Sequence, residues 1–298
     1  MYGTYVTVLV TGASGNVGRP VVDRLVACGA AVRRADRTPA DHAGPGVEQV
    51  RFDFTDPATW APAFAGVDTV FLVRPPALGD VRHDLLPAMA AARDAGVGHV
   101  VFLSLQGAER IPVVPHATVE RWLRGSGLGW TFVRPSFFTQ NLATTHAPDI
   151  RDRDELVLPA GRGRTAFVDV LDVADVAAAV LAEPRAHRGR AWTVTGPEAL
   201  TYGEVAGALT EVLGRRIAYR PTGVLRYVRH ARTALGMSTG MACVTAGIYT
   251  TARLGLAAGL TGDVRQVTGR DPRPVLETVR REAAAWRRAD PVPEEEPS

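Results

Sequence analysis

"VLVTGASGNVG", residues 8–18, is the stretch that decides how the rest of the chain is interpreted. A short apolar run, typical of a buried strand, leads into a turn containing Gly12, Gly15 and Gly18, and a helix-like segment follows. In a dinucleotide-binding turn the first glycine permits the tight bend, the second lets the backbone approach a pyrophosphate, and the third lets the helix pack closely. The stretch therefore predicts such a turn, with an unliganded glycine-rich turn as the alternative.

Outward from this turn, the first half of the chain alternates short apolar runs with amphipathic stretches. Strand-like runs recur in AAVRRADR, VEQVRFDF, VDTVFLVRPP, HVVFLSLQG and WTFVRPSFF. The alternation predicts an α/β fold with a Rossmann-type, doubly wound parallel sheet. After Pro197 the sequence becomes mostly helical, and it begins there with Thr201 and Glu204 at the spacing of a capping box.

We therefore expect two domains and a tail. Residues 1–196 should form an NAD(P)-binding Rossmann domain, and residues 197–290 a smaller, mainly helical substrate-binding subdomain. The loop at 136–165 is expected to contribute in part to the substrate site. The acidic segment DPVPEEEPS predicts a disordered tail over residues 291–298.

The charged residues exclude several kinds of chemistry. All 34 residues in the combined lysine and arginine count are arginine, so Schiff-base catalysis, a Walker lysine and a Tyr-x-x-x-Lys pair are excluded. The formal net charge of +3 is dispersed over 298 residues, which is not the pattern of a nucleic-acid-binding surface. The seven histidines show no metal-ligand spacing, so we expect no metal site.

Two further features bear on location. Cys28 and Cys243 have neither a disulfide nor a metal spacing and are expected to stay reduced, as in a cytoplasmic protein. Residues 234–252 carry no charge over 19 residues, but small and hydroxylated side chains dominate there. A buried or ligand-facing helix is therefore favoured over a membrane span.

The segment after the second expected strand bears on cofactor choice. Asp36 stands where a carboxylate would bind the ribose 2′-hydroxyl of NAD(H), and Arg37 where a guanidinium would bind the 2′-phosphate of NADP(H). Asp36 thus favours NAD(H) and Arg37 favours NADP(H). Of the two cofactors we favour NADP(H). After the third strand, Asp53 is expected beside the adenine amine and Phe54 against the base, with a helix cap as the alternative role of Asp53.

The motifs resemble a known family. HVVFLS, HATVERWLRGSGLGWTFVRPSFFTQN and FVDVLDVADVAAAVL follow the glycine turn in order, as they do in atypical short-chain dehydrogenases of the NmrA-like group. This group includes NAD(P)H:quinone oxidoreductase type 2 and triphenylmethane reductase-like enzymes. The resemblance extends from residue 6 to about residue 286.

The resemblance implies a set of cofactor-binding residues. Val73 and Arg74 are expected near the cofactor ribose, and Pro135 and Phe137 near the nicotinamide. Arg37 falls where members that prefer NADP keep an arginine, whereas Asp36 departs from the apolar residue usual in the family. The residues implied at the pyrophosphate are Gly12, Ser14, Gly15, Asn16, Val17 and Gly18.

The usual catalytic pair is missing. When the chain is aligned on Glu120, His116 takes the position of the family's lysine and Pro112 that of its tyrosine. His116 is therefore expected to hydrogen-bond the ribose or to donate a proton, since its ordinary pKa of ~6.5 suits acid–base work. Ser104 takes the place of the catalytic serine. The alternative for His116 is a surface histidine without a function, and the alternative for Ser104 is a turn residue at the end of a strand.

Loss of the tyrosine favours an acceptor that takes hydride readily. Charge spreads over the ring system of a quinone or similar conjugated aromatic substrate, so orientation and hydrogen bonds from the site can suffice. We therefore expect a cytoplasmic NAD(P)H-dependent oxidoreductase that needs neither membrane nor nucleic acid, and a homodimer is compatible with the family. The alternatives are a non-catalytic NAD(P)-sensing regulator and a biosynthetic isomerase or dehydratase on the same fold.

Overall fold

The computed structural model describes residues 7–39 and 46–288 of the chain, so the tail predicted at 291–298 lies outside the described residues. The chain divides into two compact units. The first comprises the residues up to Ser136, Val170–Thr195 and Thr261–Pro272. The second comprises Phe137–Asp169, Gly196–Leu260 and the residues from Arg273 onward.

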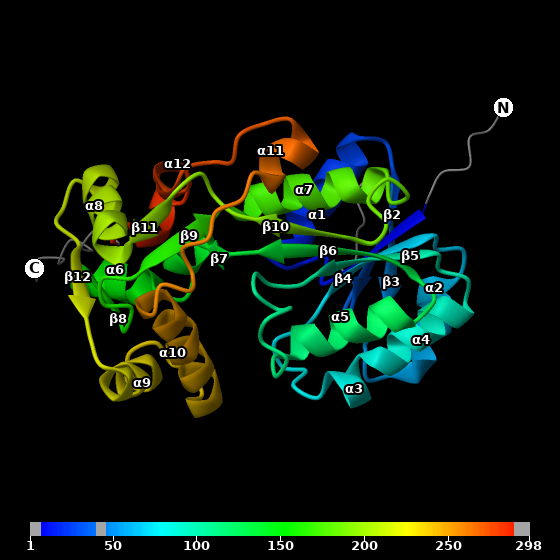
Figure 1. The fold of residues 1–298 in the computed structure, drawn as a ribbon, viewed down its shortest axis with the longest axis horizontal. Coiled ribbons are helices and arrows are strands. Elements are labelled where there is room, and N and C mark those ends of the chain that lie inside the picture. The colour runs from blue at the N-terminus through cyan, green and yellow to red at the C-terminus, as the bar shows by residue number, and fades with distance from the viewer. Residues whose placement is uncertain (1–6, 40–45, 289–298) are drawn as a thin grey trace, which may run out of the picture. The chain divides into compact units, whose positions relative to one another are not determined.

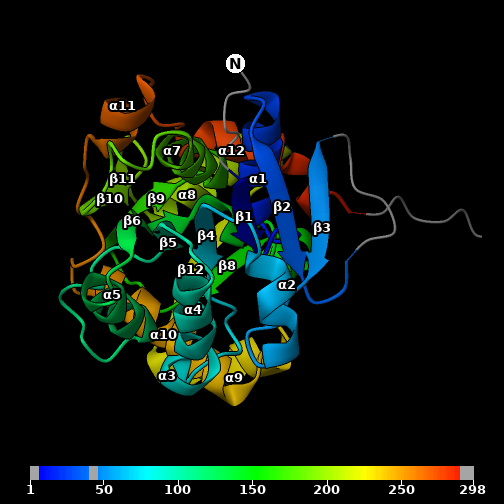
Figure 2. The same cartoon turned by 90° about the vertical axis from the view of Figure 1, so that its right-hand side faces the viewer.

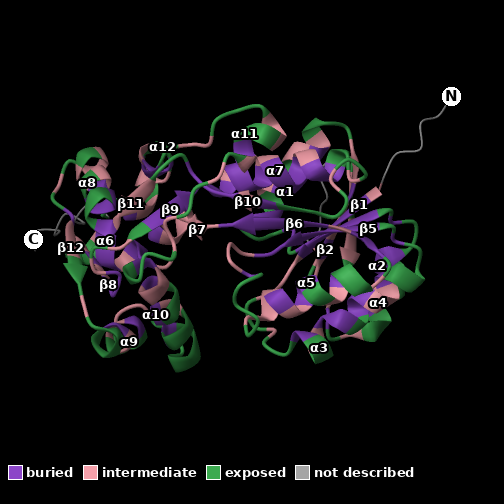
Figure 3. Ribbon diagram, viewed as in Figure 1, coloured by how far each residue is buried: buried purple, intermediate pink, exposed green. Residues whose placement is uncertain are grey.

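The first unit is built on a seven-stranded parallel sheet (Figure 1). The strand order is β10-β6-β5-β4-β1-β2-β3, which contains the doubly wound Rossmann order and confirms the predicted fold class. The central strands are mostly apolar, as expected where helices cover both faces of a sheet, and they are buried in Figure 3. The strands are β1 (Thr7–Thr11), β2 (Ala31–Asp36), β3 (Val47–Arg51), β4 (Thr69–Val73), β5 (His99–Leu103), β6 (Gly129–Pro135) and β10 (Arg190–Val194).

Helices lie on both faces of this sheet, as Figures 1 and 2 show. One face is covered by α1 (Gly18–Ala27), α7 (Val170–Ala182) and α11 (Asp263–Thr268). The other is covered by α2 (Trp60–Phe64), α3 (Val81–Asp84), α4 (Leu86–Asp94) and α5 (Pro115–Gly125), and a short 3₁₀ helix at Pro57–Thr59 precedes α2. The order of strands reverses between the neighbours β1 and β4. Ligands of such sheets bind beyond the carboxyl ends of the strands at this point.

The second unit combines two small sheets with helices. Its three-stranded sheet has the order β11-β9-β7, and its two-stranded sheet pairs β12 with β8. The strands are β7 (Phe137–Phe138), β8 (Glu155–Leu158), β9 (Arg164–Val168), β11 (Ala199–Thr201) and β12 (Ala218–Pro221). The helices are α6 (Ala147–Arg153), α8 (Tyr202–Leu213), α9 (Val224–Thr233), α10 (Thr239–Arg253) and α12 (Val275–Arg281), with 3₁₀ turns at Thr139–Leu142 and Ala283–Trp286.

The division between the units corrects the predicted boundary at residue 196. Residues 261–272 return to the first unit because they hydrogen-bond to the end of its edge strand β10. The Thr193 amide donates to Asp263 at 2.6 Å, and the Thr261 amide donates to the Thr195 hydroxyl at 3.1 Å. Residues 137–169 belong wholly to the second unit.

Local structure in the second unit matches the sequence patterns. Thr201 and Glu204 form the predicted capping box, in which the Thr201 hydroxyl accepts from the Glu204 amide and the Glu204 carboxylate accepts from the Thr201 amide at 2.7 Å. The uncharged stretch at 234–252 forms most of α10. Nowhere in residues 7–39 and 46–288 is a helix both long and apolar enough to cross a bilayer.

Candidate functional site

The glycine turn lies between β1 and α1. Gly12 has a φ of +60°, a conformation that side chains with a Cβ rarely adopt, and the Gly15 amide donates to its carbonyl oxygen at 3.0 Å. A Cβ at Gly18 would lie 2.1 Å from the same oxygen, which backbone packing forbids. The turn therefore needs glycine at both positions, as a dinucleotide-binding turn does.

The start of α1 offers backbone donors to an anion. Its N-cap residue, Val17, provides no side-chain cap, and the first turn of the helix carries no acidic residue. The Arg19 amide donates to the Gly15 carbonyl at 3.0 Å and Pro20 has no N–H, so the donors of this helix start that suit a pyrophosphate are the amides that precede Arg19. Ser14 and Asn16 are exposed in this turn, and Val17 is buried beneath it. The residues present therefore fit a dinucleotide.

Thr11, which sequence reasoning did not single out, fixes the neighbouring strands. Its hydroxyl donates to the Phe71 carbonyl at 3.1 Å and accepts from the Val73 amide at 2.8 Å. This places Val73 against the turn, where a Cβ added at Gly12 would lie 3.4 Å from the Val73 Cβ. Val73 is thus fixed beside the turn. The only signal in the sequence is a hydroxyl residue at the end of an otherwise apolar strand.

Asp36, at the end of β2, is already engaged by protein groups. Its carboxylate accepts from the Ser14 hydroxyl at 3.0 Å and from the Ser14 amide at 3.3 Å. Arg34 lies 3.5 Å away on the other carboxylate oxygen. Arg37, the next residue, is exposed. The structure therefore brings Asp36 to the glycine turn and leaves Arg37 facing solvent.

Asp53 and Phe54 have local roles in the first unit. The Asp53 carboxylate accepts from the Thr55 amide at 2.9 Å and from its hydroxyl at 2.8 Å, and these bonds lower the Asp53 pKa. Phe54 packs edge-on against Phe52, with ring centroids 4.8 Å apart, and belongs to the core. The helix-cap role falls to Asp56, which accepts from the Ala58 amide at 3.2 Å.

Arg74 and His116 approach one another at a polar corner of the first unit. Arg74 Nη1 donates to the carbonyls of Pro75 and Leu78 at 3.0 and 2.8 Å. Arg74 Nε and His116 Nδ1 are buried, and neither has a hydrogen-bond partner among the described residues. Two unpaired buried donors or acceptors in one corner are unusual in a protein interior and suit a polar ligand.

His116 is neutral in this environment. Burial lowers its pKa to about 4, the charge of Arg74 acts in the same direction, and Glu120 opposes both. The imidazole stacks on Phe102 with ring centroids 5.8 Å apart. With this pKa the imidazole is not protonated on both nitrogens near neutrality and is no imidazolium acid, so of the two roles expected for His116 hydrogen bonding by the neutral ring fits this structure.

Ser104 contacts a buried carboxylate. Its hydroxyl donates to Glu120 at 2.7 Å, and Arg134 binds the same carboxylate through two donors at 2.8 and 2.6 Å. Arg134 also pairs with Glu109 at 2.9 Å, and Arg124 with Glu120 at 3.0 Å. This cluster locks α5 to β5 and β6, and thereby fixes the helix that carries His116.

Sequence reasoning used Glu120 only for alignment and missed its structural role. The signal was present, because Glu120 falls on the buried stripe of α5 together with Ala117, Val119 and Leu123. A carboxylate on such a stripe requires a cationic partner.

The predicted nicotinamide segment divides between the two units. Pro135 ends β6, is buried, and its carbonyl accepts from the Gln106 amide at 2.9 Å. Phe137 belongs to the second unit, where its ring lies 5.7 Å from that of Phe167 and 5.6 Å from that of Tyr249. Pro135 has no backbone N–H, so any contact it makes with a cofactor does not involve amide donation.

Comparison with known proteins agrees with this geometry. Residues 12–184 match the family described as NAD(P)H-binding. The chain belongs to this family. An NAD(P)H azoreductase of Xenophilus azovorans is 36% identical over 294 residues, which cover 94% of this chain and 99% of that protein.

The chain is also similar to a second reductase and to a dye reductase of known structure. A (4-alkanoyl-5-oxo-2,5-dihydrofuran-3-yl)methyl phosphate reductase of Streptomyces griseus is 38% identical over 279 residues, 90% of this chain and 94% of that protein. Triphenylmethane reductase of Citrobacter sp., solved with NADP(H), is 26% identical with a TM-score of 0.78, and the match covers 93% of this chain and 99% of that one. The NmrA-like resemblance seen in the sequence is thereby confirmed.

Proposed function

We propose that the protein is an NAD(P)H-dependent reductase that transfers hydride to a quinone or similar conjugated aromatic substrate. The observations that carry this proposal are a glycine turn built for a dinucleotide and, elsewhere in the same unit, the corner of Arg74 and His116, where burial lowers the His116 pKa to about 4. With no lysine in the chain and no tyrosine in the usual place, the site lacks a strong proton donor. Such a site suits an acceptor that spreads the incoming charge over its own ring system.

The residues of the first unit have separate tasks in this mechanism. A bound nicotinamide would supply the hydride. Gly12, Gly15 and Gly18 would shape the turn so that its backbone and the uncapped start of α1 can approach the pyrophosphate. His116 orients the nicotinamide ribose by a hydrogen bond, and Ser104 assists from the end of β5. The remaining proposed cofactor contacts are Ser14, Asn16, Val17, Asp36, Arg37, Asp53, Phe54, Val73, Arg74, Pro135 and Phe137.

NADP(H) is the cofactor that we propose. Ser14 and Arg34 already engage the Asp36 carboxylate, while the exposed Arg37 is available to a 2′-phosphate. Arg37→Gln should weaken NADPH binding about tenfold, or ~1.4 kcal/mol, and leave NADH binding unchanged. Nicotinamide fluorescence titration measures both constants. If Arg37→Gln weakened the binding of NADPH and of NADH equally, the assignment of NADP(H) would be contradicted.

The relatives' names support an aromatic acceptor, since one is an azoreductase and another a triphenylmethane reductase. We place the enzyme in the cytoplasm, acting on a small molecule without nucleic acid, and the free cysteines Cys28 and Cys243 are compatible with a reducing compartment. A homodimer is compatible with the proposal, and light scattering would measure it.

Turnover assays test the reductase proposal. The purified protein is mixed with NADPH or NADH and a small quinone, an azo dye or a simple ketone, and nicotinamide oxidation is followed by absorbance. We expect oxidation that requires both protein and a conjugated acceptor, with the ketone inactive. Tight cofactor binding without turnover of any acceptor would instead support a non-catalytic sensor.

Variants of His116 separate positioning from proton donation. His116→Gln keeps a hydrogen-bonding group and should retain most activity, whereas His116→Leu should lower kcat about tenfold. His83→Ala is the matched control, because His83 is exposed on α3. Activity of the wild type should show no loss of rate attributable to His116 deprotonation between pH 6 and pH 8, since burial lowers the His116 pKa to about 4. A His116→Leu variant as active as the wild type would contradict the role.

A further inference from the structure

Two segments without charged residues lie next to the corner of Arg74 and His116 in the first unit. The segment 75–79 (PPALG) follows Arg74 directly, and the segment 111–115 (IPVVP) directly precedes His116 at the start of α5. The helix α3, which begins two residues after the first segment, packs against α5, and both helices cover the same face of the sheet (Figure 1). The two segments therefore border one region of the first unit.

The segment 111–115 exposes apolar side chains in a row. Val113 is 87% exposed and Ile111 is 39% exposed, and Pro112 between them is exposed as well. Among residues 7–39 and 46–288, Ile111 and Val113 are the only large apolar side chains that the first unit exposes. Single exposed apolar side chains are ordinary, whereas a run of three is uncommon unless it has a function. The exposed apolar surface of this unit is thus concentrated within five positions of His116.

Protein contacts hold this exposed run in place. Glu109, just before it, pairs with the buried Arg134 at 2.9 Å. The Val114 amide donates to the Ile111 carbonyl at 3.2 Å, which closes a turn around the run. Two of the five residues in the segment are proline, whose ring fixes φ. Apolar side chains on a backbone held in this way lose little conformational freedom when a ligand binds.

The segment 75–79 wraps around the Arg74 guanidinium. Besides the carbonyls of Pro75 and Leu78, the Pro76 carbonyl accepts from Arg74 Nη1 at 3.4 Å. The Leu78 amide donates to the Pro75 carbonyl at 3.1 Å, so the segment forms a turn. Pro76 and Ala77 are exposed in this turn, and Leu78 packs against the core of the unit. The segment therefore adds apolar surface and no charge beside Arg74.

Apolar surface beside a few unpaired polar groups is the composition of a small-molecule site. We propose that Ile111, Pro112 and Val113 bind the ring system of the acceptor and select fused-ring quinones over single-ring quinones. This inference rests on the proposed function, in which His116 orients the nicotinamide ribose. A fused ring gains affinity because it removes more apolar surface from water than a single ring does. The three residues determine specificity and take no part in proton or hydride transfer.

Binding of quinones to the complex with NADP⁺ tests the inference without hydride transfer. The probes are dimethylnaphthoquinone and duroquinone, whose quinone rings are fully substituted and therefore do not add to the exposed cysteines. By calorimetry we expect dimethylnaphthoquinone to bind about threefold more tightly than duroquinone, or better. Val113→Ser and Ile111→Ser should each weaken its binding about three- to fivefold, whereas Val113→Ile should keep it, because the interaction is an apolar contact. Equal affinity for both quinones would contradict the proposed selectivity.

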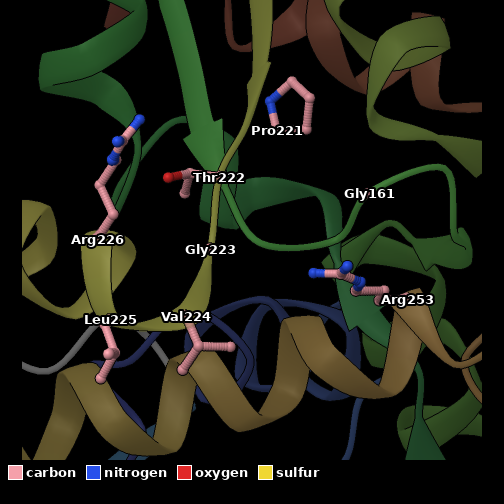
Figure 4. A pocket seen from close by; sticks show the side chains of 8 residues that line it. All are labelled: Gly161, Pro221, Thr222, Gly223, Val224, Leu225, Arg226 and Arg253. Atoms are coloured by element: carbon pink, nitrogen blue, oxygen red, sulfur yellow. The ribbon is translucent and has the colours of Figure 1, made fainter.

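Leu225→Ser is the matched control, because Leu225 is also 87% exposed but lies on α9 of the second unit, where Figure 4 shows it. This variant should bind dimethylnaphthoquinone as the wild type does, and all three serine variants should keep NADPH affinity and the wild-type circular dichroism spectrum. The inference would be overturned if the wild type bound neither quinone, or if Val113→Ser and Ile111→Ser weakened binding no more than Leu225→Ser.

Failure of the reductase proposal gives a different result. Quinone binding that Val113→Ser and Ile111→Ser weaken, without any oxidation of NADPH by the wild type, would support this apolar contact and contradict hydride transfer. With turnover, both variants should lower kcat/KM for dimethylnaphthoquinone by the same three- to fivefold factor and leave the KM for NADPH unchanged.

Discussion

Replacing Glu120 by glutamine would leave a buried arginine without its main counter-charge. Glu120 is 1% exposed and Arg134 is 8% exposed, and two hydrogen bonds of 2.8 and 2.6 Å join them. Glutamine keeps the shape, but both Glu120 oxygens accept from Arg134, so the amide NH₂ faces the guanidinium in either orientation, and in one of them it also faces the Ser104 hydroxyl. Removal of one partner of a buried pair costs ~3–5 kcal/mol. Because Arg134 keeps Glu109 at 2.9 Å, we expect a loss near the lower limit, ~3 kcal/mol.

The matched control is Arg124→Gln, which removes a partner of the same carboxylate from the solvent side. The Arg124 side chain is 43% exposed, so its loss should cost only ~0–1 kcal/mol. Urea unfolding followed by circular dichroism, without cofactor, gives both free energies of unfolding. A loss in Glu120→Gln no larger than that in Arg124→Gln would refute the reasoning that this cluster fixes α5.

Three further predictions follow from local features. Gly18→Ala places a methyl carbon 2.1 Å from the Gly12 carbonyl oxygen, so NADPH affinity should fall at least tenfold in a fluorescence titration, and unchanged affinity would contradict the turn's role. Thr201→Ala removes a helix cap and should cost ~1 kcal/mol in thermal unfolding, whereas an unchanged melting temperature would exclude a stabilising cap. Burial lowers the pKa of His99 and His146 to about 4 from an ordinary 6.5, so the unfolded chain binds more protons between these values. The free energy of unfolding should therefore be highest above about pH 6.5 and fall toward pH 4. In His99→Gln the slope of this free energy against pH should decrease by the equivalent of about one proton. A free energy of unfolding that does not change over this range would contradict the burial argument.

Much of the first unit follows from short-range patterns. The glycine turn and the capping box each lie within fewer than a dozen consecutive residues, and both have the expected geometry. Continuous apolar runs such as residues 100–103 predict buried parallel strands because helices cover both faces of such a sheet. These features depend on neighbours along the chain, which is why the sequence predicts them.

Other features depend on partners far away in the chain. The return of residues 261–272 to the first unit rests on Thr193 and Asp263, which are 70 positions apart. Asp36 appears in the sequence as a free ribose ligand, whereas in the structure Ser14, 22 positions earlier, has engaged it. The neutral state of His116 depends on burial against Phe102 and on the charge of Arg74. Tertiary contacts of this kind produce no periodic pattern in the sequence, so the sequence alone does not predict them.

The interleaving of the two units has a consequence for biosynthesis. The chain passes from one unit to the other five times, so neither unit is formed by one uninterrupted segment of the chain. On the ribosome, β6 emerges with one edge unpaired, and its partner β10 follows only after all of Phe137–Asp169 has been made. An open strand edge is a template for pairing with another chain. Fragments ending between Ser136 and Arg190 should therefore aggregate, and the nascent protein has its greatest need of a chaperone over the same interval.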